Sequence, residues 1–340
     1  MLDYRSQQFK APSLYGNFWF NSEAFSMPDL LGKIVLVHFW DYTSNPSLRS
    51  LPYVKEWSQK YKDFGLAVVG VHTPVFRFGH ERENIETAIR ELGIEFPVVA
   101  DNDALVWTSF GCRAWPGMYV VDKDGFVRFS RQGEGGYDQL ERMIQALLAE
   151  TGFHGEFPEL SVPIHPMDLP GVIPYRATGD IHTGYLRGLL GNTEGYSPEG
   201  TLDFADQGIY LPGRFYLGGK WKSEKEFVRF MGEPGEEGVV SVRYEAAEVN
   251  AVLAPGDKKP SCLLVQQDGT WLSPDHRGKD IRHGNDGSTM VMVDKPGVFN
   301  LVKNREFGEF LMTLRTGDPF VRVYLFSFVT SPIEEPVHSN

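Results

Sequence analysis

A chain of 340 residues is longer than one hydrophobic core usually organises, so two domains are expected. Hydrophobic residues make up 41% of the chain and aromatic residues 13%, which is enough to fill packed cores. The formal net charge of -12 disfavours nucleic acid and anionic membrane surfaces as partners. No apolar stretch reaches the roughly 18 residues that a membrane helix needs, so no membrane segment is predicted.

The amino-terminal residues 1–6 lack the apolar core of a signal peptide. This predicts a cytoplasmic protein, and the alternative is a periplasmic or other extracytoplasmic location if a leader has been removed. The two cysteines, Cys112 and Cys262, fall in different halves of the chain. That distribution predicts reduced thiols and no disulfide framework.

Residues 11–32 predict an N-terminal hairpin that leads into the first core strand. That strand spans residues 34–40, a β-branched apolar run typical of buried strands. Residues 48–62 have apolar side chains at the three-to-four spacing of a helix with one buried face. Pro52 lies inside this helix and is expected to bend it.

The turn between strand and helix is Asp41 to Ser47. Ser44 is placed to cap the helix, because its hydroxyl can accept from a first-turn N–H, and Pro46 sits where a missing N–H costs nothing. Two small polar residues, Ser44 and Ser47, also bracket a dipeptide at a helix N-terminus, where the dipole would lower the pKa of a thiol. With cysteines at these two positions the turn would be a redox motif.

The rest of the first half alternates strands and helices. A strand at 66–71 follows the helix at 48–62, and this strand, helix, strand order predicts a right-handed parallel crossover. A helix at 81–92 and a short strand at 96–100 are expected next. The remaining expected elements are a helix at 104–110, a hairpin of 117–121 with 126–130, and a closing helix at 137–150.

Residues 32–40, 48–54 and 114–117 resemble the thioredoxin-like α/β domain of the TlpA/DipZ group of thiol–disulfide proteins, a redoxin group related to AhpC/TSA. In that group the turn carries Cys-X-X-Cys, and here Ser44 and Ser47 occupy both cysteine positions. A hydroxyl cannot cycle through a disulfide, so no catalytic residue of the family is intact. The resemblance predicts the fold without its usual chemistry and without a cofactor.

Parallel sheets place ligand sites at the carboxyl ends of their strands. The resemblance implies that Pro116 is cis, faces the turn, and leaves the backbone of Trp115 open to an extended peptide. A peptide or protein partner is therefore expected in a groove there, although ordinary packing is the alternative for Trp115. The expected binding residues are Trp40, Tyr42, Thr43, Asn45, Pro46, His72, Trp115 and Pro116.

Several other polar residues have ordinary structural interpretations. His38, inside an apolar strand, is expected to be a core histidine with its hydrogen bonds satisfied. His72 is expected to hydrogen-bond near the loop. Asp101–Asp103 lacks the glycine and closing glutamate of a calcium loop, so a helix cap is favoured and no metal is predicted. Cys112, on the loop before Pro116, is a candidate peroxide-reactive thiol, and Cys262 is expected in a core.

The second half has a different character. We expect domains at 1–151 and 179–332, joined by a Pro- and Gly-rich linker at 152–178. Short alternating runs predict an antiparallel β-sandwich of jelly-roll type. The expected strands are 208–210, 215–217, 227–230, 239–244, 249–253, 262–265, 289–293, 310–314 and 321–328.

This half resembles the C-terminal domain of DipZ-type proteins in residues 184–185, 217–221 and 323–328. Those domains look like carbohydrate-binding modules. Trp221, Trp271 and Tyr210 are candidates for a sugar-stacking platform, with sandwich packing as the alternative.

Three functional hypotheses remain open at this stage. The first is a redox-silent binding protein that holds a peptide or protein partner. The second is a thiol–disulfide oxidoreductase or peroxidase, either with its cysteines at 44 and 47 replaced by serine in an engineered form or acting through Cys112. The third is a carbohydrate-binding protein that works through the C-terminal domain.

Overall fold

A computed structural model of the protein describes residues 9–257 and 260–333. The first eight residues of the expected first domain lie outside these ranges. The contacts divide the chain into two compact units, with the boundary between Pro170 and Gly171. In the described part of the chain, no helix is long and apolar enough to cross a membrane.

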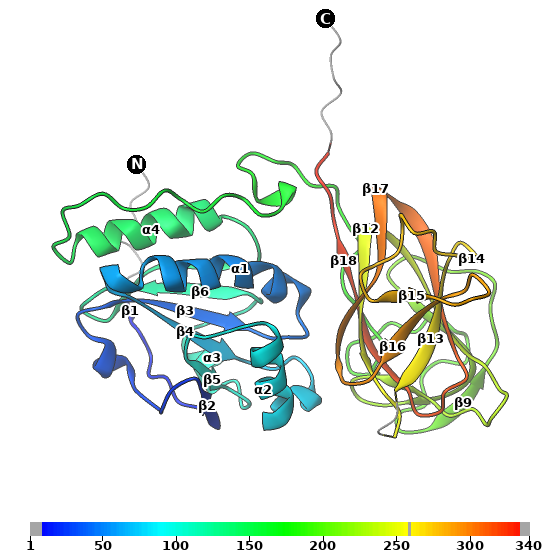
Figure 1. Cartoon of the computed structure of the whole chain (residues 1–340). Coiled ribbons are helices and arrows are strands. Elements are labelled where there is room, and N and C mark those ends of the chain that lie inside the picture. Colours follow the sequence, from blue (N-terminus) through cyan, green and yellow to red (C-terminus); the bar gives the residue numbers. More distant parts are fainter. Residues whose placement is uncertain (1–8, 258–259, 334–340) are drawn as a thin grey trace, which may run out of the picture. The chain divides into compact units, whose positions relative to one another are not determined.

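The first unit is built on a seven-stranded sheet (Figure 1). Its strand order is β1-β7-β6-β3-β4-β5-β2. The parallel strands are β3 (Ile34–Trp40), β4 (Leu66–His72) and β5 (Val98–Ala100), and the antiparallel hairpin is β6 (Gly117–Val121) with β7 (Phe126–Gln132). Every residue of β3 is buried, because it lies between neighbouring strands and is covered on both faces.

Two hydrophobic cores lie on the two faces of this sheet. Leu36 and Trp40 face the core that includes helices α1 (Asn45–Lys60), α2 (Arg82–Glu91) and α4 (Tyr137–Ala149). Val37 and Phe39 point to the other core, with the short helix α3 (Leu105–Ser109). Alternate side chains of one strand therefore serve opposite layers, as the pleat requires. The 3-10 helices are η1 (Met27–Leu30), η2 (Lys62–Phe64), η3 (Arg77–His80) and η4 (Pro166–Asp168).

The expected N-terminal hairpin is wrong. Strand β1 (Phe9–Lys10) pairs with β7, and β2 (Phe18–Phe20) pairs with β5. The two short strands thus lie at opposite edges of the sheet, as Figure 1 shows. The two edges of the sheet offer free backbone groups, so each short strand pairs with a strand far along the chain, and no local hairpin forms.

Residues 157–168 form a strap that packs on the first unit, within the segment expected to link the domains. Phe157 packs against the α1 and α4 core. The Trp57 indole N–H donates to Ser161 Oγ (3.1 Å), and the Ser161 N–H donates to Glu141 Oε2 (2.7 Å). The Tyr53 hydroxyl donates to Asp168 Oδ2 (2.6 Å) and accepts from the backbone N–H of residue 164. The strap therefore supplies partners to buried polar groups of α1 and α4.

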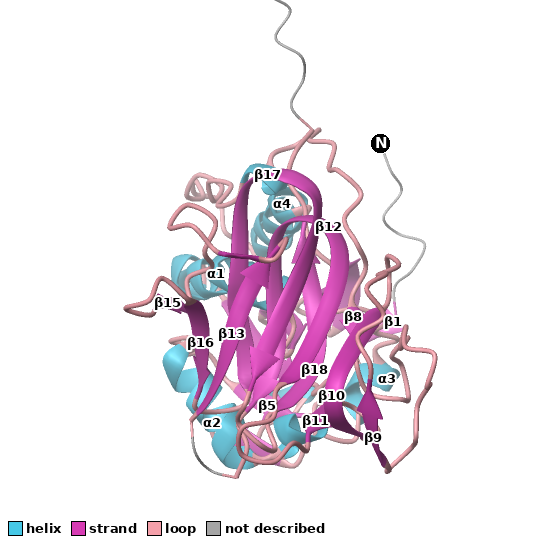
Figure 2. Cartoon of the chain, turned by 90° about the vertical axis from the view of Figure 1, so that its right-hand side faces the viewer, coloured by secondary structure: helices cyan, strands magenta, loops and turns pink. Residues whose placement is uncertain are grey.

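The second unit is an antiparallel β-sandwich (Figure 2). Two long strands run through it, β12 (Gly238–Ala254) and β17 (Gly297–Thr316). The first part of β12 pairs with β10 and its last part pairs with β18, with register shifts near residue 247. The other strands are β8 (Ile181–His182), β9 (Thr201–Phe204), β10 (Phe215–Ser223), β11 (Val228–Phe230), β13 (Ser261–Gln267), β14 (Thr270–Trp271), β15 (Ile281–His283), β16 (Thr289–Val293) and β18 (Arg322–Val329).

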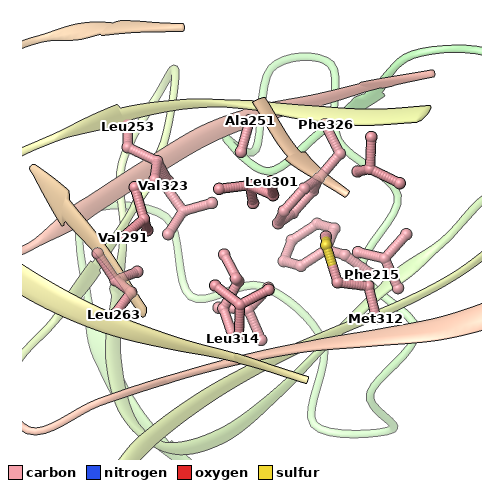
Figure 3. Packing of buried hydrophobic residues seen from close by; sticks show 14 of the residues in the cluster. Phe215, Ala251, Leu253, Leu263, Val291, Leu301, Met312, Leu314, Val323 and Phe326 are labelled. Carbon is pink, nitrogen blue, oxygen red and sulfur yellow. The ribbon is translucent and has the colours of Figure 1, made fainter. Parts of the chain in front are cut away.

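One continuous core fills this sandwich. Phe215 of β10, Leu301 and Met312 of β17, and Phe326 of β18 point toward one another (Figure 3). Two details differ from expectation. The runs 239–244 and 249–253 are parts of one bulged strand, and residues 208–210 are loop, with Ile209 exposed.

Candidate binding surface at the Ser44 turn

Both serines of the turn hold backbone groups. Ser44 is the N-cap of α1, and its hydroxyl accepts from the Ser47 N–H at 3.4 Å. Ser47 is fully buried, and its hydroxyl accepts from the Asp41 N–H at 3.3 Å. The Ser50 hydroxyl donates to the Ser47 carbonyl at 2.8 Å. The two serines thus complete the local fold of the turn where cysteines would carry out exchange.

Asp41 organises the turn, and the sequence analysis did not single it out. Its buried carboxylate accepts from the Thr43 N–H (3.1 Å), the Thr43 hydroxyl and the Val75 N–H (3.0 Å). His72 Nε2 lies 3.2 Å from the other side of the same carboxylate, at Asp41 Oδ1. Asp41 therefore ties the turn to the loop that follows β4. The available signal was an Asp two residues before a Thr directly after a buried strand, the pattern of an Asx-turn.

Four of the expected binding side chains lie inside the domain. Trp40 and His72 are 0% exposed, and Tyr42 and Thr43 are also buried. The Tyr42 and His72 rings stack at 5.4 Å between centroids, and Trp40 meets His72 edge to face. These four side chains pack under the turn and do not line a surface, because the loop after β4 covers the ends of the strands. His72 has the hydrogen-bonding role expected of it, through Asp41.

Of the other expected binding residues, Pro116 is also buried, while Asn45, Pro46 and Trp115 are partly exposed. Ser44 is partly exposed as well, and we call Ser44, Asn45, Pro46 and Trp115 the turn surface. Phe39 pairs with Gly117, so the end of β3 and the segment before β6 meet at this edge of the sheet.

The Trp115–Pro116 peptide bond is cis, as the resemblance implied. The Trp115 indole N–H donates to the Thr73 carbonyl (3.0 Å), and its ring stacks on Trp107 at 4.1 Å. The buried Pro116 accepts from the Gly133 N–H through its carbonyl (2.8 Å). Among the residues that the structure describes, the backbone N–H and C=O of Trp115 have no hydrogen-bond partner. The Trp115 indole is therefore held in place by Thr73 and Trp107, while the backbone groups of Trp115 remain without a partner among the described residues.

Cys112 is unsuited to thiol chemistry. Its side chain is buried, its thiol lies 3.6 Å from the Ala114 carbonyl, and Gly117 packs so closely that an added Cβ would meet the sulfur at 2.3 Å. Burial raises the pKa of the Cys112 thiol to about 11. A peroxide-reactive cysteine needs an accessible thiolate, so the burial of Cys112 argues against a catalytic role for it. Cys262 is only half-buried, with its sulfur 3.8 Å from Met290 Sδ.

His38 and Asp101 have structural roles. His38 is fully buried, with Nε2 3.1 Å from the Ser50 hydroxyl, while its Nδ1 has no partner among the described residues. Desolvation lowers the pKa of His38 to about 3, so its ring is neutral. Asp101 accepts from the N–H groups of Val106 (3.0 Å) and Trp107 (2.8 Å), which confirms the helix cap. Residues 9–257 and 260–333 contain no cluster of three or more His, Cys, Asp or Glu side chains arranged as metal ligands.

The sugar-stacking platform is not assembled. Trp221 is 1% exposed and packs on Phe230, Trp271 is exposed on β14, and the Tyr210 hydroxyl donates to Asp206 (2.6 Å). A buried indole cannot offer its face to a sugar ring, so the sandwich-packing alternative holds for Trp221.

Known protein families match residues in both units. Residues 5–130 match the AhpC/TSA family, and residues 179–328 match the thioredoxin like C-terminal domain. Protein DipZ of Mycobacterium tuberculosis is 31% identical over 264 residues, covering 76% of this chain but 36% of DipZ. The thiol-disulfide oxidoreductase YkuV of Bacillus subtilis is 33% identical over 142 residues, covering 41% of this chain and 95% of YkuV. A solution structure of a thioredoxin-like protein in the oxidized form covers 42% of this chain and 95% of its own, with 32% identity and a TM-score of 0.39.

The fold and the turn define a thioredoxin-like protein with an appended β-sandwich. The chain belongs to the DipZ/TlpA-type thiol–disulfide family. It spans little more than a third of the length of the DipZ proteins that it matches.

Proposed function

We propose that this protein is a redox-silent member of the family that binds an extended peptide segment of a partner protein at the turn surface. The observation that carries the proposal is the state of Ser44 and Ser47, whose hydroxyls hold the turn backbone at the two positions of the redox cysteines. No thiol replaces them, because the pKa of the nearby Cys112 is raised to about 11. The protein retains the scaffold and lacks the group that would exchange electrons.

Peptide binding is supported by the backbone of Trp115. Its N–H and C=O make no hydrogen bond with any residue of the described ranges, and Trp115 lies two residues before Gly117, which pairs with Phe39 at the end of β3 that leads into the Ser44 turn. An extended peptide pairs with such groups through its own backbone, and this gives affinity with little dependence on sequence. The indole of Trp115, anchored on Thr73, adds apolar contact area at low entropic cost.

The test uses the insulin B chain with its cysteines alkylated, so that no disulfide is present. We expect a saturable shift of the Trp115 and Asn45 amide signals when this peptide is titrated into the full-length protein. Trp115→Ala should weaken binding by about tenfold, since truncated interface tryptophans are often among the costliest losses. Trp271→Ala, which truncates an exposed indole of the second unit, is the matched control and should bind as the parent does. Binding unaffected by Trp115→Ala, or no shift at Trp115, would contradict the proposal.

A further inference from the structure

A cavity lies at the end of the first unit opposite to the Ser44 turn. It has a volume of about 530 Å³ and is lined by Leu66 to Val69 of β4 and by the chain that enters β5. This volume is within the range of small-ligand sites. The Ser44 turn follows the carboxyl end of β3, whereas this cavity opens at the amino end of β4, so the two sites are separate.

One wall of the cavity is an open strand edge. The β4–β5 ladder begins at Gly70 and Val98, where the Gly70 N–H donates to the Pro97 carbonyl (2.8 Å). In a parallel ladder, residues two apart turn their backbone groups to the same side, so Val68 faces the cavity. Continuing the ladder would require an N–H from Pro97, which proline lacks. Among the described pairings, none gives the N–H and C=O of Val68 a partner on this side.

Lysines surround this edge. Lys33 and Lys62 are exposed lining residues that precede β3 and β4, and Lys55 donates to the Leu92 carbonyl (2.8 Å) beside them. Asp63 and Glu95 also line the cavity. The charged lining is therefore one unit positive in a chain whose formal net charge is -12. The floor is apolar, with Leu30, Phe25 and Phe96 among its side chains.

We propose that this cavity binds the carboxyl terminus of an extended peptide that ends in apolar residues. The peptide backbone pairs with the N–H and C=O of Val68, as strands do when they add to an open edge. Its terminal carboxylate lies against Lys33 and Lys62, and its last side chains occupy the apolar floor. A carboxylate is favoured because charge-assisted contacts to lysine are stronger than neutral ones.

The probe is acetyl-Leu-Leu with a free carboxylate, titrated into the full-length protein while amide signals are followed. We expect a saturable shift of the Val68 amide. The carboxamide form of the probe should bind at least about fivefold more weakly, because it loses the charge. The form methylated at both amide nitrogens should be weakened by a similar factor, because it cannot donate to the Val68 carbonyl.

Lysine variants provide the second readout. Lys33→Gln and Lys62→Gln should each weaken the probe by about two- to fivefold, as expected for partly solvated ion pairs. Lys220→Gln, at an exposed position of the second unit, is the control and should change nothing. The proposal is overturned if the Val68 amide does not shift up to about 10 mM probe, a concentration that would reveal even millimolar binding. It is also overturned if decanoate and the dimethylated probe bind as well as the parent probe, because the site would then take apolar carboxylates without backbone pairing.

Discussion

His38 is a buried titratable group directly beneath the turn. Burial lowers its pKa in the folded protein to about 3, compared with 6.5 for an ordinary histidine. Between these two pH values, His38 therefore binds a proton in the unfolded state but not in the folded state. The contribution of neutral His38 to the free energy of unfolding is fully present above pH 6.5 and is lost as the pH falls toward about 3.

We predict that His38→Gln flattens this acid dependence. Between pH 6.5 and 4 the free energy of unfolding of the parent should fall by up to about 1.4 kcal/mol per pH unit from this residue alone. Glutamine retains an N–H near Ser50 and does not titrate. Urea unfolding, followed by the amide signals of β3 at several pH values, measures the slope. His154→Gln, at an exposed site, serves as control, and an unchanged slope in His38→Gln would refute the assignment.

The sequence predicted where the residues of the candidate site lie in the fold better than it predicted which of their side chains are exposed. The strand-to-helix turn placed Ser44, Ser47 and the Trp115–Pro116 segment correctly at one edge, because parallel topology dictates where strand ends meet. The sequence did not predict that the side chains of His72 and Tyr42 are buried, since their burial depends on how a distant loop folds over them. Asp41 was missed because two of its four contacts come from His72 and Val75, more than 30 residues away in the chain.

Helix α1 is the element on which the turn depends. Its N-cap bond, from the Ser47 N–H to Ser44 Oγ, is long at 3.4 Å. We predict that Ser44→Ala lowers the free energy of unfolding by about 0.5–1 kcal/mol, at the low end for a lost cap. Ser44→Asp should restore or exceed the parent value, because a carboxylate both caps the helix and interacts favourably with its dipole. Urea unfolding of the three proteins makes the comparison, and an alanine variant as stable as the aspartate variant would show that the cap contributes nothing.

Elements with strong local patterns were predictable, and those defined by long-range pairing were not. The β3 run, the amphipathic face of α1 and the β6–β7 hairpin all carry their signals within a few residues. The short strands β1 and β2 are positioned by sheet edges far away in sequence. In the second unit, bulges hide the continuity of β12, because each bulge interrupts the alternation of apolar and polar residues.

At the scale of the whole molecule, the first compact unit includes the strap of residues 157–168 and ends at Pro170. We predict that a fragment of residues 1–170 folds with a higher Tm than a fragment of residues 1–151. The shorter fragment lacks the strap partners of Tyr53 and Trp57 and the Ser161 N–H that donates to Glu141, so a difference of about 5 °C or more is expected. Circular dichroism melting of both fragments measures it. Equal Tm values would mean that the strap is a passive linker.

We propose that the absence of both thiols at the turn silences an otherwise intact exchange scaffold. The most direct measurement is insulin reduction with dithiothreitol as electron source, comparing the parent protein with the double variant Ser44→Cys/Ser47→Cys. We expect no rate above background for the parent at any pH, because neither hydroxyl can form a disulfide and the pKa of Cys112 is raised to about 11. We expect clear reduction by the double variant, since the helix N-terminus lowers the pKa of a cysteine at position 44. Reduction by the parent, or none by the double variant, would contradict the proposal that the turn is redox-silent.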